Sequence, residues 1–301
     1  MILVVGATGQ MGTEVCRRLA AKGVRVRALV RETSDPVKVQ GLRVIGAEPV
    51  VGDVRDAATL EVPCDGADSI ICTISAMPFS YLPGENDIES VDRLGVISLI
   101  DTARARGVRH FVYTSVSGHL DLEYPLRDAK RAVEAHLQAS GMRYTILRPS
   151  CPMEVWLSPA VGFDPLNATA TIYGTGERTI SWVSLADVAE FAVRSLDTPS
   201  AWDATIELGG PEALTPLEAV EVFERVSGRR FELTHVPVET LEARSHEATD
   251  PMAVSFAGLM RCVAQGDPIP MHGTLSQFPV AMMTVEGYAE RVLGAVPAGV
   301  G

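Results

Sequence analysis

Long apolar runs, lysine and paired cysteines are scarce in this chain of 301 residues. The longest apolar stretches are interrupted by Arg, Asp or Gly, so we expect no membrane-spanning helix. A strand-like run already occupies the first residues and leaves no room for a signal peptide. We therefore expect a cytoplasmic protein that does not bind membranes.

The five cysteines lie far apart and form no C-x-x-C pair, and no Cys/His group has metal-ligand spacing. We expect neither a disulfide framework nor a metal site, and we interpret the cysteines as small apolar residues. The formal net charge of −12 disfavours nucleic acid as a partner, because neutralising phosphates requires a basic surface. A composition of 47% hydrophobic and 21% charged residues excludes disorder.

What the sequence does contain is an alternation of strand-like apolar runs with amphipathic helical stretches. Strands are expected at 2–5, 24–30, 48–51, 69–73, 109–114, 144–147 and 204–208. Helices are expected at 11–21, 88–106, 128–139, 185–196 and 216–227. This alternation predicts an α/β protein with a doubly wound parallel Rossmann sheet and right-handed crossovers.

The alternation loosens after residue 150, which predicts two domains. Residues 1–150 are expected to form the Rossmann domain, with its sheet completed by about 184–209. Residues 151–183 and 210–301 are expected to form a smaller lobe that covers the substrate. Within that lobe, residues 151–167 are predicted to be loop-like because they contain three prolines.

A glycine-rich turn, V-V-G-A-T-G-Q-M-G, joins the first predicted strand to the first predicted helix. Gly6 allows a sharp turn, Gly9 lets backbone N–H groups approach a pyrophosphate, and Gly12 lets the helix pack closely on the strand. The helix N-terminus then stabilises phosphate charge. The residues expected to contact a dinucleotide here are Gly6, Thr8, Gly9, Gln10, Met11 and Gly12.

Arg31 follows the second strand, where a carboxylate would disfavour a 2′-phosphate. Its guanidinium can pair with that phosphate, so NADP(H) is favoured over NAD(H). Asp53 is placed to accept a hydrogen bond from the adenine amino group, with Val54 against the ring. Three residues after the fourth strand are expected to line the cofactor: Thr73, Ile74 and Ser75.

Together with the segments Y-T-S-V-S-G, D-A-K-R-A-V-E and Y-T-I-L-R-P, these residues resemble the NmrA-like branch of the atypical short-chain dehydrogenases/reductases. This branch includes isoflavone-reductase-like enzymes, NADPH quinone reductases and non-catalytic redox sensors. The resemblance covers about residues 1–236, and the residues that follow carry no motif that we can place. It implies a Ser or Thr at the end of the fifth strand and a Tyr-x-x-x-Lys motif on the next helix.

In that scheme the Tyr hydroxyl protonates the carbonyl, while the Lys holds the nicotinamide ribose. Ser115 and Lys130 match the Ser/Thr and Lys positions, but Leu126 stands where the Tyr is expected. Lys130 is one of three lysines, against 23 arginines. A compact ammonium binds ribose hydroxyls in a way that a guanidinium does not, which favours a functional role for Lys130.

Three residues could replace the missing tyrosine as proton donor, and one of them, Tyr81, lies in the loop after the fourth strand. Tyr124 precedes the helix that carries Lys130, and His119 follows the fifth strand. The catalytic candidates are therefore Lys130, Ser115, Tyr124 and His119. An apolar, aromatic-bearing pocket for a flat substrate is expected from Phe79, Tyr81, Met153 and Trp156.

The resemblance and the missing phenol together lead to a functional hypothesis. We expect an NADPH-dependent reductase that transfers hydride to a conjugated or aromatic carbonyl-type small molecule, such as a quinone, an enone or a polyketide-like compound. The alternative is a non-catalytic NADP(H)-binding redox sensor that acts through a protein partner. A nucleotide-sugar epimerase is a third alternative, but it normally needs the complete Tyr–Lys pair. The oligomeric state is open, with a homodimer among the alternatives.

Overall fold

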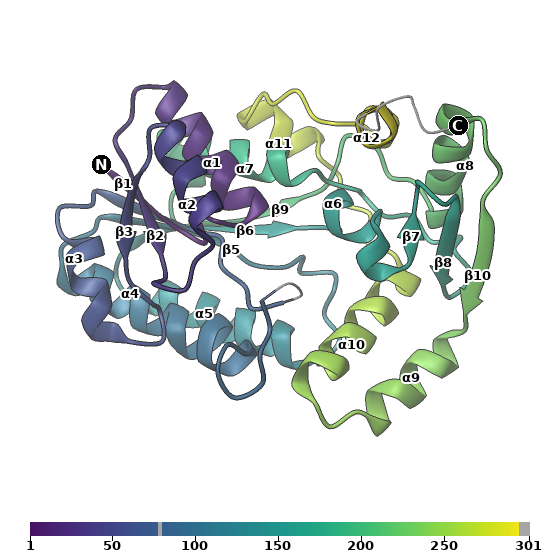
Figure 1. The fold of residues 1–301 in the computed structure, drawn as a ribbon, viewed down its shortest axis with the longest axis horizontal. Coiled ribbons are helices and arrows are strands. Elements are labelled where there is room, and N and C mark those ends of the chain that lie inside the picture. The colour runs from purple at the N-terminus through teal and green to yellow at the C-terminus, as the bar shows by residue number, and fades with distance from the viewer. Residues whose placement is uncertain (78–79, 295–301) are drawn as a thin grey trace. The chain divides into compact units, whose positions relative to one another are not determined.

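The structure of the chain is a computed structural model that describes residues 1–77 and 80–294, and it divides into two compact units (Figure 1). Unit 1 contains Met1–Val116, Glu123–Arg148 and Val188–Ile206. Unit 2 contains Ser117–Leu122, Pro149–Asp187 and the chain from Glu207 onward. The chain therefore passes between the units several times.

A seven-stranded sheet in the order β3-β2-β1-β4-β5-β6-β9 forms the centre of unit 1. The first six strands in this order pair in parallel. In chain order the strands are β1 (Ile2–Val5), β2 (Val26–Val30), β3 (Glu48–Val51), β4 (Ser69–Cys72), β5 (His110–Thr114), β6 (Arg143–Pro149) and β9 (Ala204–Leu208). The predicted doubly wound Rossmann fold is confirmed.

Helices cover both faces of this sheet. Figure 1 shows α1, α2 and α7 on one face and α4 and α5 on the other. Their bounds, with those of the shorter helices, are α1 (Gln10–Ala21), α2 (Pro36–Val44), η1 (Ala57–Leu60), α3 (Glu61–Cys64), η2 (Ile88–Gly95), α4 (Val96–Ala105), α5 (Pro125–Ala139), α7 (Leu185–Ser195) and η4 (Pro199–Ala201). Apolar residues of the sheet and of α4 and α5 share one buried core, as doubly wound folds require.

The helix expected at 88–106 has two parts. Its first eight residues form the π-helical segment η2, and α4 continues from Val96. Gly95 ends the π segment, where a Cβ would lie 2.8 Å from the Ser90 carbonyl oxygen and from Val54 Cγ2. Helix α5 begins at Pro125, three residues before the expected start, because proline suits the first helical position.

Unit 2 contains a three-stranded sheet in the order β10-β8-β7. Its strands are β7 (Phe163–Asp164), β8 (Thr169–Tyr173) and β10 (Glu232–Val236). Its helices are α6 (Met153–Trp156), η3 (Pro159–Val161), α8 (Pro216–Ser227), α9 (Val238–Glu247), α10 (Pro251–Gln265), α11 (His272–Gln277) and α12 (Val285–Gly294). The ring centroids of Phe163 and Phe223 lie 4.9 Å apart in the core of this unit.

Two features of unit 2 differ from the expectation. Residues 151–167 are not a loop, since they contain α6, η3 and β7. Strand β7 forms there because it pairs antiparallel with β8 and buries Phe163. Strands β8 and β10 were not predicted either, although they pair in parallel over five residues.

Two features are absent from the described residues: a membrane-spanning helix and a metal-binding cluster. No helix within 1–77 and 80–294 has the length and apolar character to cross a bilayer. Across the same ranges, no three His, Cys, Asp or Glu side chains come together as a metal site would need.

Candidate functional site

The glycine-rich turn has the close backbone packing that the sequence predicts. Gly6 has a φ of +83°, and a Cβ there would lie 2.7 Å from Thr73 Oγ1. A Cβ on Gly12 would lie 2.2 Å from the Gly6 carbonyl oxygen, so only glycine fits. The Gly9 amide donates to that same oxygen at 3.0 Å and closes the turn. The turn is therefore a tight backbone loop that has no room for a side chain at positions 6 and 12.

The N-terminus of α1 fits a diphosphate. Gly9 is its N-cap and supplies no side-chain hydrogen bond, and the first turn contains no acidic residue. The first backbone N–H groups and the positive end of the helix dipole can therefore bind an anion. Thr8 is half-buried, Gln10 is exposed and Met11 is buried. The backbone N–H groups of this segment fit the phosphates of a dinucleotide cofactor.

Arg31, the candidate for a 2′-phosphate, has a partner within unit 1. Its Nη1 donates to Asn86 Oδ1 at 2.8 Å. Asp53 accepts from Arg55 Nε and Nη2 at 3.0 and 2.5 Å. The hydrogen bonds from Arg55 outweigh burial and hold the pKa of Asp53 below its ordinary value. The Asp53 carboxylate is therefore ionised and already bonded to a guanidinium.

The other residues expected to line the cofactor lie at the ends of strands β3 and β4. Val54 is buried and packs against Gly95. Thr73 Oγ1 donates to the Val5 carbonyl at 3.1 Å, across the two central strands. Ser75 Oγ accepts from the Met77 amide at 3.2 Å, which shapes the segment after β4. The backbone in this region is fixed by its own hydrogen bonds.

Lys130 lies where β4 and β5 end. Its Nζ is 3.1 Å from the Ile74 carbonyl oxygen, 3.5 Å from the Thr114 carbonyl oxygen and 3.4 Å from Asp92 Oδ1. The lysine is 4% exposed and Asp92 is fully buried. The Tyr113 ring lies 5.2 Å from Nζ. A buried ammonium thus sits at the carboxyl edge of the sheet with a buried carboxylate as counter-ion.

Asp92 connects Lys130 to the segment that follows β4. Its Oδ2 accepts from the Ala76 amide at 2.9 Å, while Oδ1 faces Lys130. Asp92 comes from the π-helical segment η2, and such segments often occur at functional sites. The sequence analysis missed this residue. An acidic residue between Ile88 and Val96, on the apolar face of the predicted helix, was a signal that could have found it.

No phenol lies one turn before Lys130, because Leu126 occupies that position and is buried. Tyr124 is the N-cap of α5 and is only 2% exposed. Tyr113 is fully buried, and its hydroxyl has no hydrogen-bond partner within the described part of the chain. Burial raises the pKa of Tyr113 well above its ordinary value. Tyr113 is therefore a core residue and not a proton donor.

Ser115 belongs to a buried polar network. Its Oγ lies 3.4 Å from Arg131 Nη1, and Glu134 pairs with Arg131 at 2.8 Å and with Arg148 at 2.5 Å. Burial raises the pKa of Glu134, but hydrogen bonds from Arg148 and Ser115 and the charge of Arg131 hold it below its ordinary value. The Ser115 hydroxyl is consequently fixed by an ionised network.

His119 belongs to unit 2 and is half-exposed. Its Nδ1 lies 3.2 Å from Asp267 Oδ1, and Asp267 is fully buried. Ser117 Oγ donates to the same Oδ1 at 3.0 Å. The sequence analysis found His119 but missed Asp267, which is about 150 residues away and follows a segment without a recognised motif.

The expected substrate residues are distributed over both units. Tyr81 packs against the core of unit 1. Met153 and Trp156 are buried in the core of unit 2. Phe79 lies outside the described residues. The structure therefore places three of these four side chains, each within its own unit.

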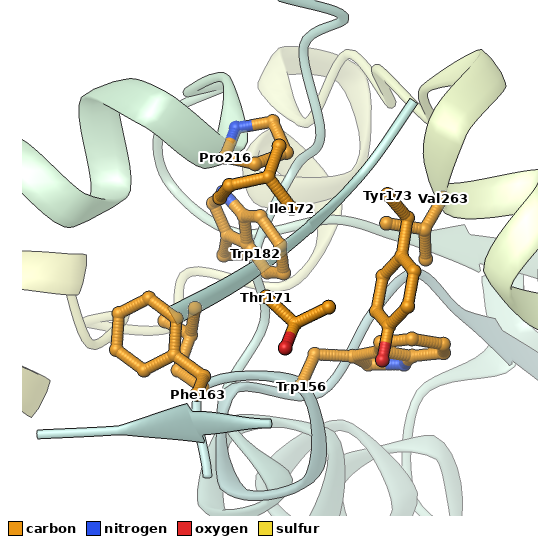
Figure 2. Close-up of a pocket in the computed structure, with 9 residues that line it drawn as sticks. Trp156, Phe163, Thr171, Ile172, Tyr173, Trp182, Pro216 and Val263 are labelled. Atoms are coloured by element: carbon orange, nitrogen blue, oxygen red, sulfur yellow. The ribbon is translucent and has the colours of Figure 1, made fainter. Parts of the chain in front are cut away.

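Trp156 borders a small cavity inside unit 2 (Figure 2). Figure 2 shows its ring facing that of Tyr173, with Thr171 and Trp182 beside them. The cavity offers about 20 Å³ to the centres of water molecules, which is room for about one water. It is too small for an aromatic substrate.

Comparison with known proteins assigns the family. The sequence model of the NmrA-like family matches residues 1–288. The chain belongs to the NmrA-like family. The resemblance seen in residues 1–236 is thereby confirmed, and the match extends over most of the C-terminal segment in which no motif could be placed.

Several known proteins are similar to this chain over most of its length. Photosystem II assembly factor Ycf39 of Guillardia theta is 32% identical over 80% of this chain and 74% of that protein. The (4-alkanoyl-5-oxo-2,5-dihydrofuran-3-yl)methyl phosphate reductase of Streptomyces griseus is 34% identical over 77% of this chain and 76% of that enzyme. An NADPH-dependent quinone oxidoreductase from Escherichia coli, crystallised with NADPH, has a TM-score of 0.77 and 23% identity. That alignment covers 97% of this chain and all of the other, and it shows a shared fold.

Proposed function

We propose that this NmrA-like protein is an NADPH-dependent reductase that transfers hydride to a conjugated or aromatic carbonyl-type small molecule. The observation that carries the proposal is the buried Lys130–Asp92 pair where β4 and β5 end, in the same unit as the glycine-rich turn. Ligands of open α/β sheets bind at this edge. A buried lysine there matches the ribose-binding lysine of the family.

The residues that would hold NADP(H) all belong to unit 1. The turn from Gly6 to Gly12 and the N-terminus of α1 would bind the diphosphate, and Arg31 would exchange Asn86 for the 2′-phosphate. Lys130 would bind the nicotinamide ribose by giving up the Thr114 carbonyl, its most distant hydrogen-bond acceptor. When bound, the cofactor supplies the hydride.

The missing phenol favours a conjugated acceptor. With Leu126 in place of the tyrosine, no strong proton donor stands one turn before Lys130. A quinone or enone spreads the developing negative charge over several atoms, so it depends less on a positioned acid. Two relatives with reductase names, one acting on quinones and one on an unsaturated lactone phosphate, are consistent with this class of acceptor.

Among the catalytic candidates, His119 fits the role of proton donor best. It is half-exposed, whereas Tyr124 is buried and the Ser115 hydroxyl is engaged by Arg131 and Glu134. We also propose that the acceptor contacts Tyr81, Met153 and Trp156 and that unit 2 covers it.

NADPH oxidation measured with a panel of quinones, enones and ketones tests this function. Replacing Lys130 alone would leave Asp92 buried and unpaired, so the test variant combines Lys130→Met with Asp92→Asn and removes both charges. We expect kcat to fall at least about a hundredfold in the double variant, while the fold is retained. Lys38→Met, on the exposed surface of α2, is the matched control and should turn over like the wild type.

Three results would contradict parts of the proposal. Tight NADPH binding without turnover of any acceptor would favour the redox sensor that acts through a protein partner. Full activity in the double variant would remove Lys130 from the mechanism. Tighter binding of NAD(H) than of NADP(H) would show that Arg31 does not bind a 2′-phosphate.

A further inference from the structure

Asp267 is a fully buried carboxylate that the proposed mechanism has not yet used. It lies in the bridge between residues 180 and 267, where its amide donates to the Thr179 carbonyl at 2.9 Å and its carbonyl accepts from the Ser181 amide at 3.0 Å. These two backbone hydrogen bonds fix the direction of the Asp267 Cα–Cβ bond. The fold of unit 2 therefore limits where the carboxylate can lie.

The carboxylate faces the segment that carries His119. Oδ1 lies 3.2 Å from His119 Nδ1 and accepts the Ser117 hydroxyl at 3.0 Å. Ser117 Oγ in turn accepts the His119 amide at 3.1 Å, so the backbone of the histidine is held as well as its ring. Gly118, between them, donates its amide to both Glu207 carboxylate oxygens at 3.0 and 3.2 Å. Three consecutive residues are thus anchored to two acidic side chains.

The charge balance around Asp267 favours a cationic partner. Its Oδ2 has no hydrogen-bond partner within the described residues, and a buried carboxylate is costly without an opposite charge. The charge of Asp267 acts on the thiol of Cys151, and the carboxylate of Glu207 lies near Gly118. Neither group can be a cation. His119 is the ion-pair partner that the structure gives to Asp267.

We propose that Asp267 is the positioning residue for His119: it binds Nδ1–H, stabilises the imidazolium and leaves Nε2–H to donate a proton to the reduced acceptor. The proposal rests on the proposed reductase function. Orientation of a general-acid histidine by a buried carboxylate is a recurring solution in enzymes. Asp267 itself would touch neither substrate nor cofactor.

The proton and electron balance closes within the proposed reaction. Bound NADPH would supply a hydride, with its two electrons, to an acceptor carbon, and His119 Nε2 would supply the proton to the acceptor oxygen. The oxidised cofactor and the reduced acceptor would leave, and the imidazole would be neutral with its remaining proton on Nδ1. Since His119 is half-exposed, solvent can restore the proton on Nε2. The Ser117 hydroxyl donates to Asp267, so it is not a nucleophile activated by the histidine.

A measurement on the free protein tests the dyad without any turnover. Long-range proton–nitrogen NMR of histidine labelled with ¹⁵N distinguishes the two neutral tautomers and the imidazolium, and loss of one signal in His119→Gln assigns the residue among six histidines. We expect His119 to keep a proton on Nδ1 when it is neutral, and to lose this preference in Asp267→Asn. A wild-type His119 without a proton on Nδ1 would overturn the proposal.

Measuring the effect of Asp267→Asn on kcat in the wild type and in a His119→Ala variant separates a positioning role from structural damage. We expect Asp267→Asn to lower kcat about tenfold to a hundredfold with unchanged KM, and Ser117→Ala to lower it less. In a His119→Ala background, Asp267→Asn should have no further effect, because a positioning residue acts only through its histidine. Additive losses in both backgrounds would overturn the proposal. Glu232→Gln, on exposed strand β10, is the control for loss of a carboxylate in unit 2.

The two experiments also keep the two proposals apart. If the Nδ1 proton is observed but no acceptor is reduced, the reductase function fails and the geometry of the dyad stands. If acceptors are reduced and His119→Gln retains full kcat, the reductase function stands and the role of the dyad as a proton donor fails.

Discussion

Lys130, Glu134 and His110 show three ways in which unit 1 tolerates a buried ionisable side chain. Lys130 has a buried counter-ion in Asp92, and Glu134 lies between two guanidinium groups. His110 remains neutral instead. Thr145 Oγ1 donates to the Ala201 carbonyl at 2.7 Å, so its oxygen can accept a hydrogen bond from His110 Nε2–H at 2.9 Å.

His110 should make the stability of unit 1 depend on pH. Burial and, secondarily, the charge of Arg143 lower the pKa of His110 from 6.5 to about 4. As pH falls through this interval, the unfolded chain binds a proton that the folded chain excludes, so the free energy of unfolding decreases. Below both pKa values, His110 is protonated in the folded and in the unfolded chain, so it no longer makes the free energy of unfolding depend on pH. Denaturant titrations at several pH values should show a loss of about 3 kcal/mol from this residue.

The matched variant is His110→Gln, which keeps an N–H donor toward Thr145 but cannot titrate. Its unfolding free energy should fall less than that of the wild type across the same pH interval. If the unfolding free energies of the two proteins depended equally on pH, the pKa of His110 would not be lowered in the folded state.

At the scale of single elements, the glycine-rich turn was predictable because its signal is local. The strand β1, the three glycines and helix α1 occupy consecutive residues, and backbone packing alone requires glycine at positions 6 and 12. The start of α8 was predictable for the same reason, since Thr215 and Glu218 form a capping box next to Pro216.

Gly12→Ala tests the packing of α1 on the turn. Alanine favours a helix interior by up to about 1 kcal/mol over glycine, but a Cβ at this position would lie 2.2 Å from the Gly6 carbonyl oxygen. We expect the steric effect to dominate, with a net destabilisation of about 1–3 kcal/mol and loss of NADPH binding. Thermal unfolding and fluorescence titration with NADPH measure the two effects.

Gly41→Ala in α2 is the control, because a Cβ there meets nothing within 4 Å. It should stabilise the protein slightly and leave cofactor affinity unchanged. If Gly12→Ala behaved in the same way, the close contact between helix and turn would not limit binding.

Elements and residues that depend on distant partners escaped prediction. Strand β10 is almost entirely exposed, so it lacks the apolar alternation by which a half-buried strand is recognised. It forms because it pairs with β8, about 60 residues earlier. Asp267 likewise could not be recognised from the sequence, because its neighbours Ile180 and His119 are distant along the chain. Periodicity and spacing carry no information about such pairings.

At the scale of the whole molecule, each unit has a hydrophobic core of its own. The core of unit 1 is dominated by aliphatic side chains of the sheet and its helices, whereas unit 2 is built around aromatic rings. Phe223 is fully buried there, and its ring contacts those of Phe163 and Tyr288 at 4.9 and 6.3 Å. Each core can therefore be weakened by itself.

Phe223→Ala should destabilise unit 2 by about 3–5 kcal/mol, because it removes a buried ring and leaves a cavity. Hydrogen exchange followed by mass spectrometry should show faster exchange in β8, α8 and α12, with β1 and β4 largely unaffected. Phe111→Ala, in the core of unit 1, should produce the reverse pattern. Uniform acceleration in both variants would mean that the two cores unfold as one cooperative unit.

The interrupted course of the chain also has a consequence for biosynthesis. Unit 1 is assembled from three stretches, and the last strand of its sheet, β9 (Ala204–Leu208), begins 55 residues after β6 (Arg143–Pro149) ends. During synthesis, the edge of β6 that pairs with β9 therefore stays unpaired while residues 150–203 are made. Such an edge is a site where nascent chains associate wrongly. The passage through this stage is where the newborn protein would depend most on chaperones.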